Sequence, residues 1–411
     1  MKIMSKTFQF ATEKKYSSLI FIFLVSFILR LIYIFLFEAE IDPLDDPSYY
    51  LRIVKNILDG KGYMEGNLLA YRPPLYAYFI AGIFSMFGSN LDVVRIIQSL
   101  LASAMCVVIF LIGSKFLLTR IGIMAAGFCA IYPPLIHYSV QLWTEQLFMF
   151  LLILAFLGFL FAERSPSFLW KIITGILLGL SALTREGALL VLFGFLIWHV
   201  IFSKNLLLSL KRWWVLALFT LLTISPWTMR NYLVFGKLVP VATNGGINFY
   251  MGNNPEATGT FRWAIPPGAT WNKESTNGFF ETQASSLGYK HGLQFIRDNP
   301  GQFLKLVAKR AFYLLQPPYR VIHFQESKAE TISKIVWLVM YLILFVFAFI
   351  IAPFHLRFEP KVLSLLFITI FMLALPYLIT YGATRYRLPM IPFMAMAAAV
   401  VADRIFSRRG N

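Results

Sequence analysis

The sequence predicts an all-α polytopic membrane protein with about ten transmembrane helices, interfacial helices in the first outer loop and a small external loop domain. The first observation is composition: of the 411 residues, 58% are hydrophobic and 14% are charged, whereas soluble domains contain about 45–50% and about 25%. Second, apolar stretches approaching the roughly 20 residues of a bilayer span recur along the chain. Third, Lys and Arg lie mostly in short segments between these stretches. Together these observations exclude a soluble enzyme.

The apolar stretches give the expected positions of the spans in order. The first is a retained span rather than a cleaved signal peptide, because its apolar run is long, contains Arg30 and is not followed by a small-residue cleavage pattern. The expected spans are 17–37, 93–117, 120–137, 143–162, 169–184, 186–202, 211–229, 333–353, 361–381 and 387–405.

Two segments between the expected spans are long, about 38–92 and about 230–332. They divide the chain into three expected parts. Residues 1–232 form a transmembrane core that includes the first outer loop, 38–92. Residues 233–332 form an external loop domain, and residues 333–411 form the C-terminal transmembrane helices.

The distribution of Lys and Arg predicts the orientation. With both termini in the cytoplasm, the short outer segments hold only Arg185, Arg385 and Arg387. The inner ones hold Lys2, Lys6, Lys14, Lys15, Lys115, Arg120, Arg164, Lys171, Lys204, Lys211, Arg212, Arg357, Lys361, Arg404, Arg408 and Arg409. This bias places both long segments outside a plasma or inner membrane.

The remaining composition argues against several partners and cofactors. The net charge is +17, but the basic residues do not form a run that would bind nucleic acid. Cys106 and Cys129 both lie in apolar stretches, and the five histidines lack the helical spacing of metal ligands. No glycine-rich phosphate loop occurs. We therefore expect no nucleic acid, no metal and no cofactor.

Each long segment has its own pattern. In the first, Ser48–Leu58 predicts an amphipathic helix on the membrane surface, and Leu75–Phe87 is short for a span and predicts an interfacial helix. In the second, Asn and Gly between Thr243 and Gly259 predict turns, where a glycan-contacting loop is the alternative. Ser286–Gln316 predicts a basic helical stretch.

Acidic and basic side chains from separate parts of the sequence collect at the expected outer face. They are Asp45, Asp46, Glu145, Arg185, Glu186, Arg230, Arg385 and Arg387. Polar groups at membrane depth tend to mark function. Each also has a structural interpretation: the two aspartates as helix caps, the arginines as residues that position span ends, and Glu145 as the partner of an arginine.

The functional interpretation assigns chemistry to the same groups. A carboxylate at a helix N-terminus stays ionised and can act as a general base on a hydroxyl. Guanidinium groups bind phosphate through two hydrogen bonds, so Arg385, Arg387, Arg185 and Arg230 are candidates to bind a lipid-linked phosphate. Glu145, Arg72 and Tyr50 are candidate substrate-binding residues.

The chain resembles the GT-C glycosyltransferases, in particular the branch of the protein O-mannosyltransferases and the lipid A aminoarabinose transferase. The resemblance covers nearly the whole length and rests on the order and spacing of its motifs. They are Asp45-Asp46-Pro-Ser-Tyr-Tyr50, Asn56–Tyr63, Tyr71–Tyr76, Thr144–Phe148, Leu183–Glu186, Pro226–Tyr232 and Arg385–Pro389.

The resemblance implies transfer of a sugar from a polyprenyl-phosphate donor to a lipid, envelope-glycan or protein acceptor at the outer leaflet. It implies that Asp46 is the catalytic carboxylate, with Asp45 as the alternative, and that Arg385 and Arg387 contact the donor phosphate. Aminoarabinose transferases carry a Glu-Lys pair where this chain has Arg72 before Pro73. That departure disfavours lipid A as acceptor and aminoarabinose as sugar.

The expected mechanism inverts the configuration at the anomeric carbon of the sugar. Asp46 deprotonates the acceptor hydroxyl while arginines stabilise the charge that grows on the leaving phosphate; for a phosphate acceptor, Asp46 would only orient the nucleophile. The alternative function is a transporter or flippase of polyprenyl-phosphate-linked lipids. Transporters carry their charges near the membrane midplane and often show two matching halves, and the sequence has neither feature.

Overall fold

The computed structural model describes residues 2–36, 46–165, 167–269, 279–317, 328–356 and 360–408. Asp45, one of the two candidate catalytic carboxylates, lies outside these ranges. Within them every regular element is a helix and there is no strand. The elements are α1 (Lys2–Leu36), α2 (Asp46–Leu58), α3 (Leu75–Phe87), α4 (Leu91–Phe116), α5 (Thr119–Ile131), α6 (Pro133–Val140), α7 (Glu145–Arg164), α8 (Phe168–Thr184), α9 (Ala188–Ser203), α10 (Leu206–Phe235), α11 (Gly245–Gly252), α12 (Phe279–Asp298), α13 (Pro300–Leu315), α14 (Lys328–Phe345), the π-helix η2 (Val346–Ile351), the 3₁₀ helices η3 (Ala352–His355) and η4 (Thr384–Met390), α15 (Pro360–Ile379) and α16 (Ile391–Arg408).

The all-helical membrane fold expected from the sequence is confirmed. An apolar helix occupies each of the ten predicted stretches. Seven helices of the described ranges are long and apolar enough to cross a membrane, and an eighth span results if the bent pair α5–α6 is counted as one. The helices α8 and α9 are shorter, with 17 and 16 residues. The count of ten spans therefore remains a prediction.

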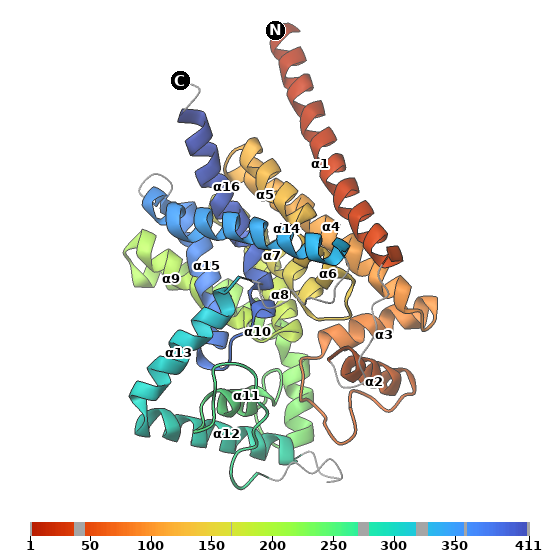
Figure 1. Cartoon of the computed structure of the whole chain (residues 1–411), viewed down its shortest axis with the longest axis vertical. Coiled ribbons are helices and arrows are strands. Elements are labelled where there is room, and N and C mark those ends of the chain that lie inside the picture. The colour runs from red at the N-terminus through yellow and green to blue at the C-terminus, as the bar shows by residue number, and fades with distance from the viewer. Residues whose placement is uncertain are drawn as a thin grey trace.

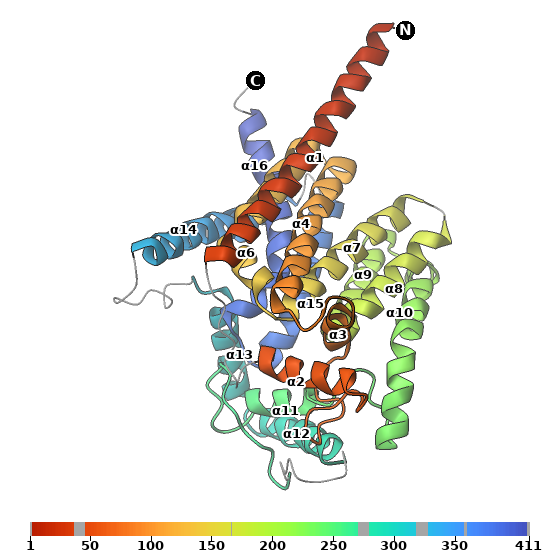
Figure 2. The ribbon, with the colours of Figure 1, turned by 90° about the vertical axis from the view of Figure 1, so that its right-hand side faces the viewer.

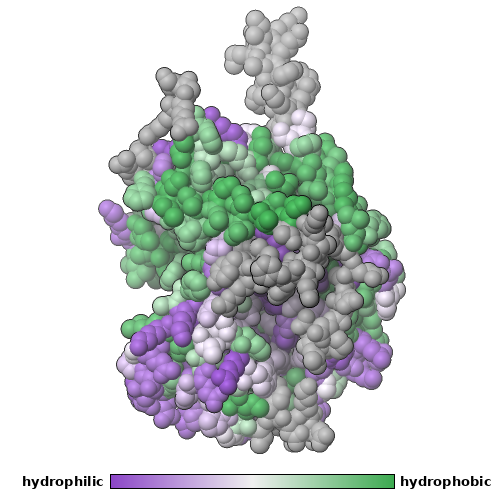
Figure 3. Space-filling view, viewed as in Figure 1, coloured by the Kyte–Doolittle hydropathy of each residue, from purple (hydrophilic) through white to green (hydrophobic). Residues whose placement is uncertain are grey.

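The helices form a bundle with two different ends (Figure 1). The N-terminal end of α1 and the C-terminal end of α16 project from one end, which we call the terminal end. The helices α2, α11 and α12 lie at the other, which we call the loop end (Figures 1 and 2). Helix α14 crosses the bundle instead of running along it. On the face seen in Figure 3, hydrophobic side chains cover the middle of the bundle and hydrophilic ones gather near the loop end.

A buried arginine explains how the chain tolerates the break between α5 and α6. The two helices are bent by 56° at Pro133, whose ring nitrogen has no hydrogen to donate. Arg30 of α1 is fully buried. Its guanidinium donates hydrogen bonds to the carbonyl oxygens of Ala130, at 3.2 Å, and Leu135, at 3.5 Å. The charged side chain therefore satisfies backbone acceptors on both sides of the break.

In the first long segment, 38–92, the two predicted helices are confirmed. Helix α2 covers the expected amphipathic stretch and buries Tyr50, Ile53 and Val54, while α3 coincides with the expected interfacial helix. The chain between them is held by Glu281 of α12. The Glu281 carboxylate accepts hydrogen bonds from the backbone N–H groups of Leu69 and Ala70, so α12 is in direct contact with the chain between α2 and α3.

The second long segment differs from its prediction in two places. The Asn- and Gly-rich stretch contains the helix α11 instead of turns alone, because its small residues allow close packing: a Cβ at Gly246 would lie 1.9 Å from the carbonyl oxygen of Ser285 in α12. The basic stretch is two helices, since Pro300 begins α13. Its Arg310 is buried, not on the surface, and donates to the carbonyl oxygens of Leu378 and Gly252.

Candidate active site

Asp46 stands at the start of α2, before Pro47, as expected of a helix N-terminus. Its side chain is 23% exposed and forms ion pairs with two arginines from distant segments. One is Arg72, from the loop before α3, and the other is Arg385 of η4, whose Nη2 atom lies 3.2 Å from Oδ2. The sequence grouped these residues only by their expected side of the membrane, and the structure brings them into contact.

Glu145, the first residue of α7, lies deeper and is fully buried. Its Oε1 atom is 2.7 Å from Nη1 of Arg185 and 2.8 Å from Nε of Arg385. An isolated buried carboxylate would be strongly disfavoured, so two guanidinium groups explain how an acid can occupy this position. Arg385 therefore joins the deep carboxylate Glu145 to the partly exposed carboxylate Asp46.

Aromatic side chains hold this arrangement in place. The guanidinium of Arg385 lies 3.6 Å from the ring centre of Trp143, a cation–π contact. Arg185 donates a hydrogen bond of 3.1 Å to the hydroxyl of Tyr377, whose ring stacks on that of Tyr386. We refer to Asp46, Arg72, Glu145, Arg185 and Arg385 as the ion-pair network.

Tyr50 lies behind the ion-pair network and is only 2% exposed. The Arg72 guanidinium is 5.7 Å from its ring centre and 4.8 Å from that of Tyr49. Burial raises the pKa of the Tyr50 hydroxyl to about 12, although the charge of Arg72 opposes this rise. Tyr50 therefore lies close to the Arg72 guanidinium, in a position shielded from solvent.

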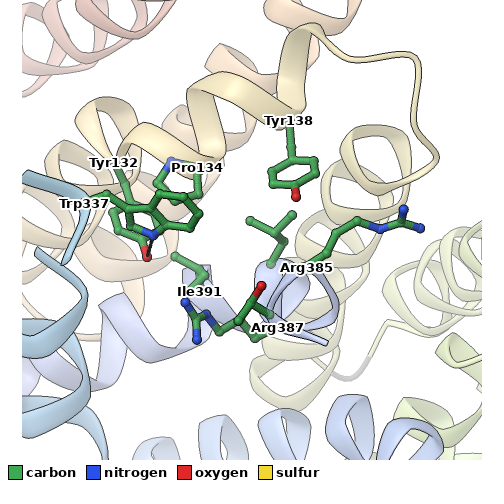
Figure 4. A pocket seen from close by; sticks show the side chains of 9 residues that line it. Tyr132, Pro134, Tyr138, Trp337, Arg385, Arg387 and Ile391 are labelled. Atoms are coloured by element: carbon green, nitrogen blue, oxygen red, sulfur yellow. Dashed lines mark hydrogen bonds between the residues drawn. The ribbon is translucent and has the colours of Figure 1, made fainter. Parts of the chain in front are cut away.

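Arg387 points to a different side of η4 from Arg385 (Figure 4). It donates a 2.5 Å hydrogen bond to the carbonyl oxygen of Gln316, at the end of α13, and lies 3.8 Å from the ring centre of Tyr341. Its Nη2 atom is buried without a hydrogen-bond partner in the described chain. The two arginines that the sequence paired thus face different surroundings.

A small cavity lies between these two arginines and α6, α14 and α16. It is lined by Tyr132, Pro134, Tyr138, Trp337, Thr384, Arg385, Arg387, Leu388 and Ile391 (Figure 4). Its volume is about 10 Å³, which is the room that one water molecule needs. A phosphate group enters this cavity only if side chains move.

Arg230 lies outside the ion-pair network. At the end of α10 it donates hydrogen bonds to the carbonyl oxygens of Leu69, at 2.8 Å, and Tyr63, at 3.2 Å. Its guanidinium also lies 4.8 Å from the ring centre of Trp227. These contacts tie the first outer loop to α10.

Other residues at the loop end carried no distinguishing sequence signal. No motif or charge pattern marks Glu281, Trp143 or Tyr377 in the sequence. Their contacts are seen only in the structure. Glu186, noted in the sequence for its position, accepts a hydrogen bond from the backbone of Ala242, and burial raises the pKa of its carboxyl to about 7. In the described ranges no three His, Cys, Asp or Glu side chains are grouped as metal ligands would be.

A family model and solved structures are similar to this chain. Residues 71–229 match the model of the dolichyl-phosphate-mannose-protein mannosyltransferases, a range that includes Arg72, Glu145 and Arg185. The archaeal oligosaccharyltransferase AglB from Archaeoglobus fulgidus, solved with an inhibitory peptide and a dolichol-phosphate, superposes with a TM-score of 0.58 at 12% identity. The chain has a GT-C glycosyltransferase fold.

These matches cover different shares of the compared chains. The AglB match covers 97% of the chain but 51% of AglB, so the chain spans about half the length of that enzyme. ArnT from Cupriavidus metallidurans, solved with undecaprenyl phosphate, matches at 11% identity and a TM-score of 0.46, covering 96% of this chain and 78% of ArnT. No curated protein matches the sequence.

Proposed function

We propose that this GT-C chain is a membrane glycosyltransferase that moves a sugar from a polyprenyl-phosphate donor to an acceptor at the outer face of the membrane. The observation that carries the proposal is the ion-pair network, which joins the N-termini of α2 and α7, the α8–α9 turn and η4 at the loop end. Asp46 is its partly exposed carboxylate, and Glu145 its buried one. We assign the general base to Asp46 and the positioning of Arg185 and Arg385 to Glu145.

The charge of the network supports a phosphate-linked donor. Three guanidinium groups and two carboxylates leave one net positive charge, which matches the single negative charge of a sugar phosphodiester. After the sugar leaves, the lipid phosphate is a monoester, which takes a second negative charge above its second pKa. The network therefore favours the growing charge on the leaving group, which is the interaction that accelerates a reaction.

Arg385 gives the step its geometry. Its guanidinium contacts both carboxylates, so a donor phosphate that binds it competes with Asp46. The Asp46 oxygen so released accepts the proton of the acceptor hydroxyl. The hydroxyl oxygen then forms a bond to the anomeric carbon as the carbon–oxygen bond to phosphate breaks, and the phosphate leaves with the electron pair. Attack opposite the leaving group inverts the anomeric carbon.

Donor and acceptor classes rest on the relatives and on the external segment. Dolichol-phosphate bound to AglB supports a polyprenyl-phosphate donor, and the match to protein mannosyltransferases supports a hydroxyl acceptor on a protein, lipid or envelope glycan. We assign acceptor choice to residues 238–332. The bias of Lys and Arg supports a loop end that faces outward, with both termini in the cytoplasm.

A transfer assay tests the proposal. Purified protein in nanodiscs is incubated with radiolabelled polyprenyl-phosphate sugars and an envelope extract. The comparison is between the wild type, Asp46→Asn and the control Asp59→Asn, which alters a carboxylate at the other end of the same helix.

The expected result is label leaving the lipid with the wild type and with Asp59→Asn, while Asp46→Asn binds donor but transfers at least about a hundredfold more slowly. Equal transfer rates for Asp46→Asn and the wild type would show that Asp46 is not the general base. Donor that crosses liposome bilayers without being consumed would show a flippase instead.

A further inference from the structure

A second polar site lies at the opposite end of the helix that carries Glu145. Helix α7 runs from Glu145 to Arg164, a length of about 30 Å, and Figure 2 shows the α7–α8 connection far from α2 and α11. A cavity of about 210 Å³ opens there, lined by Ala162, Glu163, Arg164, Ser165, Lys171 and Arg212. This volume is many times the 10–15 Å³ or so that one water needs, unlike the cavity beside Arg387.

The charge of this cavity is unbalanced. Its one acid, Glu163, pairs with His199 of α9, whose Nε2 lies 3.2 Å from the Glu163 carboxylate. Among the residues with described positions, no carboxylate forms an ion pair with Lys171 or Arg212. Lys361 of α15 acts electrostatically on the same carboxylate and also has no ion pair. The cavity is therefore a cationic recess.

The three lining cations come from different helix ends, and one of them is already oriented. Arg164 donates a 2.8 Å hydrogen bond to the carbonyl oxygen of Lys115, and its guanidinium lies 4.3 Å from the ring centre of Phe116. Lys171 lies 5.1 Å from the ring centre of Phe168. These contacts hold Arg164 and Lys171 at the rim, and Glu163 is the one lining carboxylate beside three lining cations.

We propose that this recess binds the phosphodiester headgroup of an anionic phospholipid. The recess is polar and positively charged, and it sits where apolar helices end, with exposed Leu206 and Leu207 of α10 beside Arg212 along the chain. A phosphodiester supplies the missing negative charge, and its acyl chains extend along the apolar helix faces. Basic pockets between membrane helices recognise lipid headgroups in this way.

The inference is independent of the proposed function, because the recess and the ion-pair network lie at opposite ends of α7. Lys171 and Arg212 lie near the N-terminal ends of α8 and α10, where a helix dipole does not favour a cation. If they served only to orient the chain, any two basic residues at this end would be equivalent. The proposal instead requires the particular pair Lys171 and Arg212.

Native mass spectrometry of the full chain tests this difference. The protein is released from nanodiscs of equal parts phosphatidylglycerol and phosphatidylcholine, and retained lipids are counted. Lys171→Gln/Arg212→Gln is compared with the matched control Lys204→Gln/Lys211→Gln, which removes two exposed charges of the same end. Lys171→Arg/Arg212→Lys keeps the charge and guards against a folding defect.

The wild type, the control pair and the charge-conserving pair are expected to retain phosphatidylglycerol in preference to phosphatidylcholine. The neutral pair loses about 25-fold in retention, because each basic side chain near a headgroup contributes a factor of about five. Equal loss in both neutral pairs, or no lipid preference in the wild type, overturns the proposal. Displacement of phosphatidylglycerol by millimolar inorganic phosphate also overturns it, by identifying a free-phosphate site.

Discussion

Arg385 of η4 forms an ion pair with Asp46 of α2, which precedes it by 339 residues. The contact joins the turn before α16 to the start of α2. Because the same guanidinium also lies 2.8 Å from Glu145, one side chain sets the distance between two carboxylates. Arg385 therefore bridges the two carboxylates of the candidate active site from a short 3₁₀ turn.

Replacement of Arg385 by Lys is expected to lower kcat/KM for the donor by about a hundredfold, the usual loss when one stabilising donor is removed. An ammonium group keeps the charge but cannot reach both carboxylates and a phosphate with a planar fork. Steady-state kinetics with the labelled donor measures the loss. Arg387→Lys is the comparison, and a larger kinetic loss in that variant would assign phosphate binding to Arg387.

Arg230→Ala is expected to loosen the first outer loop, because its guanidinium holds the carbonyl oxygens of Tyr63 and Leu69. Limited proteolysis should cut the chain near these residues faster than in the wild type, while the KM for the donor changes less than about twofold. A raised donor KM with unchanged proteolysis would instead place Arg230 at the donor phosphate.

Arg30→Met is expected to destabilise the protein by about 2 kcal/mol, the usual loss when a charged hydrogen-bond donor leaves buried acceptors without a partner. The acceptors are the carbonyl oxygens of Ala130 and Leu135, beside the α5–α6 break. Thermal unfolding in detergent measures the effect. Ile28→Met, at an exposed position of the same helix, is the control, and equal melting temperatures of the two variants would contradict the bracing role.

Glu186 is expected to make stability depend on pH. Its folded pKa is about 7, above the ordinary 4.5, because of burial, so the folded state binds more protons than the unfolded chain between these values. The stabilising contribution of Glu186 to the free energy of unfolding is fully present below pH 4.5 and is lost as pH rises through 7. The melting temperature of the wild type should fall over this window relative to that of Glu186→Gln. Parallel curves for both proteins would show that Glu186 does not titrate there.

The sequence predicted the positions of the apolar helices. These positions follow from hydropathy, which is a local property. It also predicted α2 and α3, because the apolar patterns of 48–58 and 75–87 extend over nearly the same residues as these helices. Span number was harder, because α8 and α9 are shorter than a typical span and Pro133 divides another.

The contacts inside the site could not be predicted, because they depend on directions that sequence spacing does not determine. Arg385 and Arg387 are two residues apart, and the 3₁₀ turn points them into different surroundings. Glu281 accepts a hydrogen bond from the backbone N–H of Leu69, which lies 212 residues earlier in the chain. No local sequence pattern indicates such a partner. Arg310 has the sequence context of a surface cation, yet packing buries it.

The hydrogen bonds of Glu281 to the first long segment also limit which segments of the chain can be exchanged separately. Its carboxylate accepts hydrogen bonds from the backbone of Leu69 and Ala70 and from the hydroxyl of Thr243. A chimera that takes residues 233–332 from another protein therefore keeps these contacts only when the new segment brings both an acid in place of Glu281 and a hydroxyl in place of Thr243. Because Leu69 and Ala70 take part only through backbone N–H groups, their side chains need no matching replacement.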